Sequence, residues 1–216
     1  MLIDLKLDAK TIMVVGGGEE GYRKTQSFVD SGAKIWVISK EFSRGIQKLC
    51  EEKKVALLKT EIKDAQSFVG SLNPKPDVLL AVTNDPKLNF ELVKAAKSVG
   101  CMVYAVDNPA LSDFILPAVA KVGDVKIAVS TSGKSPAMAR VLRQRIEKMI
   151  TPEDLLEIQL QANVRSILKE KVSDPKVRSK VLYEILNNDN IKQALKEGKL
   201  QEAEKMALKL LKETQK

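Results

Sequence analysis

Three glycines near the start of the chain have the spacing of a phosphate-binding turn. Gly16-x-Gly18-x-x-Gly21 follows an apolar run, Ile-Met-Val-Val, and precedes a helix-like stretch. Gly16 allows a tight turn, Gly18 lets the backbone approach a pyrophosphate, and Gly21 lets strand and helix pack closely. The following helix would point its N–H groups at the phosphates. We therefore expect a dinucleotide site that includes Glu19 and Glu20, although a βα turn without a ligand is the alternative.

Roughly 20 residues beyond such glycines, NAD-specific folds usually place an acidic residue on the ribose hydroxyls. Here Ser39 and Lys40 occupy that place, and Glu41 follows. Glu41 could reach the ribose, whereas Lys40 and Arg44 could equally meet a 2′-phosphate. The residues by themselves leave NAD and NADP both open.

Polar residues also follow the apolar run at 78–82. Thr83, Asn84 and Asn89 could line the cofactor, because the carboxyl ends of parallel strands border the ligand crevice. Asp85 followed by Pro86 is also a typical helix start. Both interpretations can hold together.

Asp107 is the best-placed candidate base in the sequence. The chain has no histidine, so acid–base work falls to carboxylates, lysine, tyrosine or water. Asp107 ends a predicted strand at residues 102–106, where a carboxylate would lie over the ligand crevice. Because Asn108 and Pro109 follow, the alternative is a residue that only caps a turn.

A run of hydroxyl and basic residues before a helix start predicts an anion site. Arg143 lies three positions after Arg140, so the two could clamp carboxylates together. The alternative is an ordinary helix cap with solvated arginines. The residues expected to bind substrate are Ser130, Thr131, Ser132, Lys134, Ser135 and Arg140.

Composition limits the partners. The 216 residues carry a net charge of +8, which suits an anionic partner or a lysine-rich solvated surface. Aromatic residues make up only 4%, too few for stacking on nucleic acid, and no apolar run is long enough for a membrane span. Cys50 and Cys101 have no metal-ligand spacing. We expect a cytoplasmic, reduced protein with no metal site, no nucleic-acid partner and no membrane partner.

The first half of the chain alternates strand and helix patterns, which predicts a Rossmann-type doubly wound parallel sheet. A dinucleotide-binding domain is expected at residues 1–113. The predicted strands are 12–15, 34–38, 55–59, 78–82 and 102–106, and the predicted helices are 23–30, 42–53, 65–72 and 87–99.

The second half changes character. Extended segments at 114–120 and 126–130 and a helix at 136–149 predict a small dimerisation and substrate segment over 114–150. From Thr151 the pattern is entirely helical, with further starts at Asp174 and Asp189 and a stop at Gly198. This helical region, 151–216, is expected to have a thin core and therefore to need a partner surface.

Taken together, these motifs resemble the precorrin-2 dehydrogenases of the sirohaem synthase family. The resemblance covers about the first 150 residues, in the family's order, while the helical tail is similar only in kind and length. It depends on Asp4-Leu-x-Leu7, Val14-Val-Gly-Gly-Gly18, Arg23-Lys24, Ala81-x-Thr-Asn-Asp85, Leu88-Asn89, Val106-Asp107, Asp113-Phe-Ile-x-Pro117, the stretch 127–136 and Ala139-Arg140.

The resemblance implies NAD-dependent oxidation of precorrin-2 to sirohydrochlorin by a homodimer, with Asp107 as the catalytic aspartate. Some members also insert iron, and here we expect dehydrogenation alone. The chain departs from the family in two places: Tyr104-Ala105 stands just before the Val-Asp turn, where an asparagine is frequent, and Gly21 stands where alanine or another small residue is frequent. The rival hypothesis is a regulatory module that senses NAD without catalysis.

Overall fold

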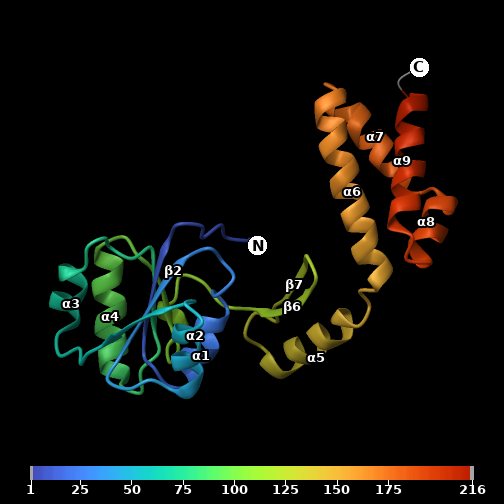
Figure 1. Ribbon diagram of the computed structural model, residues 1–216. Coiled ribbons are helices and arrows are strands. Elements are labelled where there is room, and N and C mark those ends of the chain that lie inside the picture. The colour runs from blue at the N-terminus through green and yellow to red at the C-terminus, as the bar shows by residue number, and fades with distance from the viewer. Residues whose placement is uncertain (1, 215–216) are drawn as a thin grey trace. The chain divides into compact units, whose positions relative to one another are not determined.

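The computed structural model describes residues 2–214, with side chains up to Leu211. The chain divides after Leu116 into two compact units, and each is described here by itself. Figure 1 shows a sheet with helices in the first unit and a largely helical second unit.

A five-stranded parallel sheet forms the centre of the first unit, in the order β3-β2-β1-β4-β5. This order reverses direction between β1 and β4, which is where doubly wound folds bind their ligands. The predicted fold class is confirmed. The strands are β1 (Thr11–Val15), β2 (Lys34–Ser39), β3 (Ala56–Lys59), β4 (Val78–Ala81) and β5 (Met102–Ala105).

Helices cover both faces of this sheet (Figure 1). One buried cluster joins the sheet to Ile46 and Leu49, and a second joins it to Val69 and Leu92. The strands are therefore apolar on both faces, as expected for buried parallel strands. The helices are α1 (Glu19–Gln26), α2 (Arg44–Glu51), α3 (Ala65–Ser71) and α4 (Pro86–Ser98).

The predicted limits of the first helix, residues 23–30, are wrong. The helix α1 begins at Glu19, because Gly18 takes an extended conformation as its N-cap and two acidic residues fill the first turn. It ends at Gln26, after which the N–H groups of Ser27 and Phe28 donate to carbonyls three residues earlier, in turn geometry. The earlier start brings the helix N-terminus directly onto the glycine turn.

The second unit starts with the antiparallel strands β6 (Ala118–Val122) and β7 (Val125–Val129), against which α5 (Pro136–Glu147) packs. The segment predicted as extended at 114–120 becomes a strand only at its end. Phe114 and Leu116 instead pack against the core of the first unit. In residues 117–150, only Ala120 and Ala139 are fully buried hydrophobic side chains.

Four further helices complete the second unit: α6 (Pro152–Lys171), α7 (Pro175–Leu186), α8 (Asp189–Lys196) and α9 (Leu200–Thr214). They enclose a core of their own, in which Leu160, Leu168, Ile185 and Ile191 are at most 1% exposed. The expectation of a thin core in this region was therefore wrong. By contrast, β6, β7 and α5 contain few buried hydrophobic side chains.

Candidate active site

In the glycine turn between β1 and α1, only one of the glycines has open space where a side chain would lie. Gly16 has a φ of 127°, and a Cβ there would lie 2.3 Å from the carbonyl oxygen of Val82. A Cβ on Gly21 would lie 2.0 Å from the carbonyl oxygen of Gly16. A Cβ on Gly18, in contrast, would meet nothing within 4 Å, and Glu19 beside it is exposed. The turn thus forms a cradle that opens at the N-terminus of α1, where the first backbone N–H groups of the helix can donate to a pyrophosphate.

Gly17 brings the glycine turn against the end of β2, a role the sequence analysis missed. A Cβ at Gly17 would lie 2.2 Å from the carbonyl oxygen of Glu41 and 2.7 Å from Cβ of Ser39. Ser39 and Glu41 therefore lie beside the turn, as a ribose contact requires. Lys40 takes a different partner, because its Nζ is 2.6 Å from a carboxylate oxygen of Glu61.

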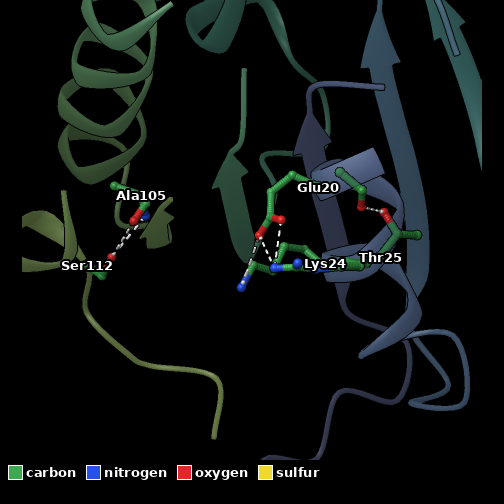
Figure 2. Close-up of polar contacts among 7 residues, drawn as sticks. Glu20, Lys24, Thr25, Ala105 and Ser112 are labelled. Carbon is green, nitrogen blue, oxygen red and sulfur yellow. Dashed lines mark hydrogen bonds and ion pairs between the residues drawn. The ribbon is translucent and has the colours of Figure 1, made fainter. Parts of the chain in front are cut away.

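Charged residues of α1 form a small cluster near β5. Glu20 pairs with Arg23 at 2.7 Å and with Lys24 at 3.4 Å, and Figure 2 shows its carboxylate turned toward Lys24. The Nζ of Lys24 lies 4.9 Å from the ring centroid of Tyr104. The centroids of the Tyr104 and Phe114 rings are 5.9 Å apart. The tyrosine that departs from the family pattern thus receives a cation on its ring face.

Three of the predicted residues meet at the carboxyl ends of β4 and β5. The Oδ1 of Asn89 accepts hydrogen bonds from the N–H and the hydroxyl of Thr83, at 3.1 and 2.7 Å. Its Nδ2 donates to the carbonyl oxygen of Thr83 at 3.1 Å and to Oδ2 of Asp107 at 3.2 Å. Asn89 is 1% exposed, whereas Asp107 and Asn84 are exposed. The candidate base is therefore open to a ligand and anchored from beneath.

The loop that carries Asp107 returns to β5 and bonds to its outer side. Asp113 exchanges two hydrogen bonds with the backbone of Val103, each 2.9 Å long. The Ser112 hydroxyl accepts from the N–H of Ala105 at 2.9 Å and donates to its carbonyl oxygen at 3.3 Å (Figure 2). Burial raises the pKa of the Asp113 carboxyl, but the ammonium of Lys97 at 2.8 Å and the N–H of Val103 outweigh burial and lower it. Asp113 thus remains a charged acceptor.

Cys101 lies outside this chemistry. Burial raises the pKa of its thiol to about 12, and the Sγ donates to the carbonyl oxygen of Pro76 at 2.9 Å. The thiol therefore stays protonated and packs as a small core side chain. Cys50 is half-buried. Among residues 2–214 the structure has no group of three metal-ligating side chains and no helix of membrane-spanning length and apolarity.

The predicted anion loop lies in the second unit, between β7 and α5. Ser132 has a φ of 52°, and Ser130 Oγ accepts from its N–H at 3.3 Å. Thr131 Oγ1 accepts from the N–H of Ser135 at 3.1 Å, and Ser135 Oγ caps α5. Three of the predicted hydroxyls therefore hold the loop in shape.

Several basic side chains of this region face solvent. Lys134 and Arg140 are both exposed, one in the loop and one on α5. Arg143 instead pairs with Glu147 at 2.5 Å, so it is already engaged within α5. Lys134 and Arg140 are thus exposed charges at or near this loop that an anion could meet, and Arg145 further along α5 is exposed as well.

Comparison with known proteins gives one consistent family. Residues 3–118 match the family described as "Putative NAD(P)-binding", and residues 122–149 match that described as "Sirohaem biosynthesis protein central". The precorrin-2 dehydrogenase of Methanosarcina barkeri is 32% identical over 87% of this chain and 83% of its own. The siroheme synthase of Methylococcus capsulatus is 32% identical over 95% of this chain, which spans 42% of that longer protein.

A solved structure of the precorrin-2 dehydrogenase SirC has the same fold. It superposes with a TM-score of 0.75 at 20% identity, over 97% of this chain and 99% of the other. Both the sequence relatives and the glycine-turn domain agree with a dehydrogenase that uses a nicotinamide cofactor. The chain belongs to the precorrin-2 dehydrogenase and siroheme synthase family.

Proposed function

We propose that this protein catalyses the NAD-dependent dehydrogenation of precorrin-2 to sirohydrochlorin. The observation that carries the proposal is the position of Asp107, exposed at the carboxyl end of β5 and bonded to Asn89 beside the ligand edge of the sheet. The Methanosarcina barkeri relative, named for this activity, covers most of the chain. A regulatory NAD-sensing module would have no use for an anchored, exposed carboxylate at this place.

NAD is the proposed cofactor in preference to NADP. The backbone of Glu41 lies against Gly17 beside the cradle, and its carboxylate is the proposed partner of the ribose hydroxyls. The ammonium of Lys40, one of the two cations that could meet a 2′-phosphate, is paired with Glu61 at 2.6 Å. Gly16, Gly18 and Gly21 with the N-terminus of α1 would hold the pyrophosphate, and Thr83 and Asn84 would border the rest of the cofactor.

In the proposed reaction the substrate loses a hydride and a proton. A bound nicotinamide supplies the hydride acceptor. The Asp107 carboxylate accepts the proton, since the chain has no histidine and the carboxylate is exposed on the ligand side. Asn89 and the loop bonded to β5 hold that carboxylate in place, so little reorganisation is needed when the substrate arrives.

Precorrin-2 carries several carboxylates, and we propose that Lys134 and Arg140 bind some of them. Both side chains are exposed, and the backbone of the surrounding loop is fixed by Ser130, Thr131 and Ser135. We propose that residues 114–150 act as the substrate and dimerisation segment, the dinucleotide domain being 1–113 and the helical domain 151–216.

A direct assay tests the proposed function. Purified protein, NAD and precorrin-2 are mixed, and formation of NADH and of sirohydrochlorin is followed by absorbance. We expect equal amounts of both products. If NAD binds in calorimetry but no NADH forms with precorrin-2, the rival NAD-sensing function is favoured. The same assay with NADP in place of NAD decides the cofactor.

Alanine at both Lys134 and Arg140 is expected to raise the KM for precorrin-2 by about 10-fold or more, because each exposed charge contributes roughly 1 kcal/mol to holding an anion. KM for NAD should stay the same, and added salt should raise the native KM for precorrin-2. Lys176 and Lys180 of α7, both exposed, provide the control: their double alanine variant loses the same charge. Equal KM values in the two double variants would make Lys134 and Arg140 ordinary surface residues.

A homodimer is proposed because Ala120 and Ala139 are the only buried hydrophobic side chains of β6, β7 and α5. Val119 is 49% exposed and Met138 is 44% exposed, and such apolar surface is typical of a subunit contact. We expect a species of twice the chain mass in sedimentation equilibrium. Val119→Lys should shift it to a monomer, whereas Val177→Lys on α7 should not. A native protein that sediments as a monomer would contradict the proposal.

A further inference from the structure

The side chain of Asn89 has every polar atom engaged. A carboxamide offers two N–H donors and an oxygen with two lone pairs. The oxygen accepts from the N–H and hydroxyl of Thr83, and the nitrogen donates to the Thr83 carbonyl and to Asp107 Oδ2. The reversed amide would set an NH₂ group against the Thr83 N–H and an oxygen against the carboxylate. Only one orientation satisfies the site, and it directs an N–H at Asp107.

This amide connects three separate elements. Asn89 lies in α4, Thr83 follows β4, and Asp107 follows β5. Asn89 is 1% exposed, so its amide is held inside the protein, while the Asp107 carboxylate that it reaches is exposed to a ligand. A hydrogen bond to a charged acceptor is stronger than one between neutral groups. Thr83 fixes the amide and the amide fixes the carboxylate, so the turn after β4 determines where Asp107 is held.

We propose that Asn89 is a positioning residue for Asp107 and not a cofactor contact as expected from the sequence. Its Nδ2 restrains Oδ2 of Asp107 and leaves the other carboxylate oxygen for the substrate. This inference rests on the proposed function, since it assigns the proton-accepting role to Asp107. It predicts that loss of Asn89 affects kcat only when Asp107 is present.

A double-mutant cycle tests this dependence. Asn89→Ala should lower kcat by about 10- to 100-fold, the value of one hydrogen bond to a charged group, with KM for NAD unchanged. In an Asp107→Ala background the same substitution should change kcat by no more than about twofold. An equal loss in both backgrounds, or a loss expressed in KM for NAD, overturns the inference.

Two further variants separate positioning from simple destabilisation. Asn89→Asp has the same shape but no N–H group that could donate to Asp107, so it should show the same loss in kcat. It replaces Asn89→Ala in the test if that variant folds poorly. Ala96→Gly, nearer the other end of α4, removes a methyl group that is 0% exposed and introduces a poor helix former. It should lower thermal stability without lowering kcat. Parallel losses of kcat and stability in all three variants would contradict a positioning role.

An NMR measurement is independent of catalysis. The side-chain amide resonances of Asn89, assigned by their absence from Asn89→Ala, should shift in Asp107→Ala because one amide proton loses its acceptor. Resonances that stay in place overturn the inference. A native protein that forms no NADH from precorrin-2 while these resonances do shift overturns the proposed function instead, so the two failures are distinct.

Discussion

Asp107→Asn is expected to lower kcat by about 10²–10⁴-fold, the usual contribution of a general base, with KM for NAD almost unchanged. Asparagine has nearly the same volume, and its oxygen can still accept the hydrogen bond that Asn89 donates at 3.2 Å. It cannot accept a proton from the substrate. Steady-state NADH formation at saturating precorrin-2 measures the effect.

The alternative for Asp107 was a residue that caps the turn before Asn108 and Pro109. Asparagine caps turns as well as aspartate does, so that role predicts almost no loss of activity. Asp124→Asn, an exposed substitution in the turn between β6 and β7, controls for the lost charge and should leave kcat unchanged. Turnover near the native rate in Asp107→Asn would leave Asp107 with a structural role only.

Gly18→Asp is expected to abolish detectable NAD binding while the protein stays folded. A Cβ at this position meets nothing within 4 Å, and aspartate is a favoured N-cap residue, so α1 should be at least as stable as before. The new carboxylate would occupy the open cradle and repel a pyrophosphate. Calorimetric titration with NAD, together with a thermal unfolding curve, separates binding from folding.

Gly70→Asp is the matched control, because Gly70 lies in α3 and a Cβ there also meets nothing within 4 Å. This variant should bind NAD as the native protein does. Gly21 would not serve, since a Cβ there would lie 2.0 Å from a backbone oxygen and disturb the fold. Native affinity in Gly18→Asp would remove the cofactor assignment from the glycine turn.

The sequence was sufficient to predict the sheet, because β-branched runs alternated with amphipathic stretches and polar turns. The strands were placed within one or two residues of the structure. The limits of α1 were missed because Gly21 lies inside its first turn, and glycine is a poor helix former that a pattern analysis assigns to the preceding loop. The structure nevertheless requires glycine at position 21, because a Cβ there would lie 2.0 Å from the carbonyl oxygen of Gly16.

Side-chain pairing within the site was not accessible in the same way. The type and position of Asn89 and Asp107 were noticed separately, but their hydrogen bond spans 18 residues of chain and depends on how α4 packs beside β5. Nothing in the sequence pattern indicated that Ser112 and Asp113, in the loop after β5, both bond to that strand. Gly17 was overlooked because the spacing pattern leaves its position unspecified, whereas its contact with the chain after β2 requires a glycine.

The departure at Tyr104 also becomes intelligible only in three dimensions. In the structure the ring contacts both the ammonium of Lys24 and the ring of Phe114. Both contacts are favourable for a tyrosine, so packing against Phe114 and the attraction of the Lys24 ammonium stabilise Tyr104 at this position.

The loop bonded to β5 also bears on aggregation. The last strand of an open sheet usually presents unpaired N–H and C=O groups that can template the addition of a strand from another molecule. On the outer side of β5, the backbone groups of Val103 and Ala105 are already bonded to Asp113 and Ser112. This side of the sheet is therefore closed to intermolecular strand pairing, and a crowded solution of the folded protein should not form cross-β assemblies through it.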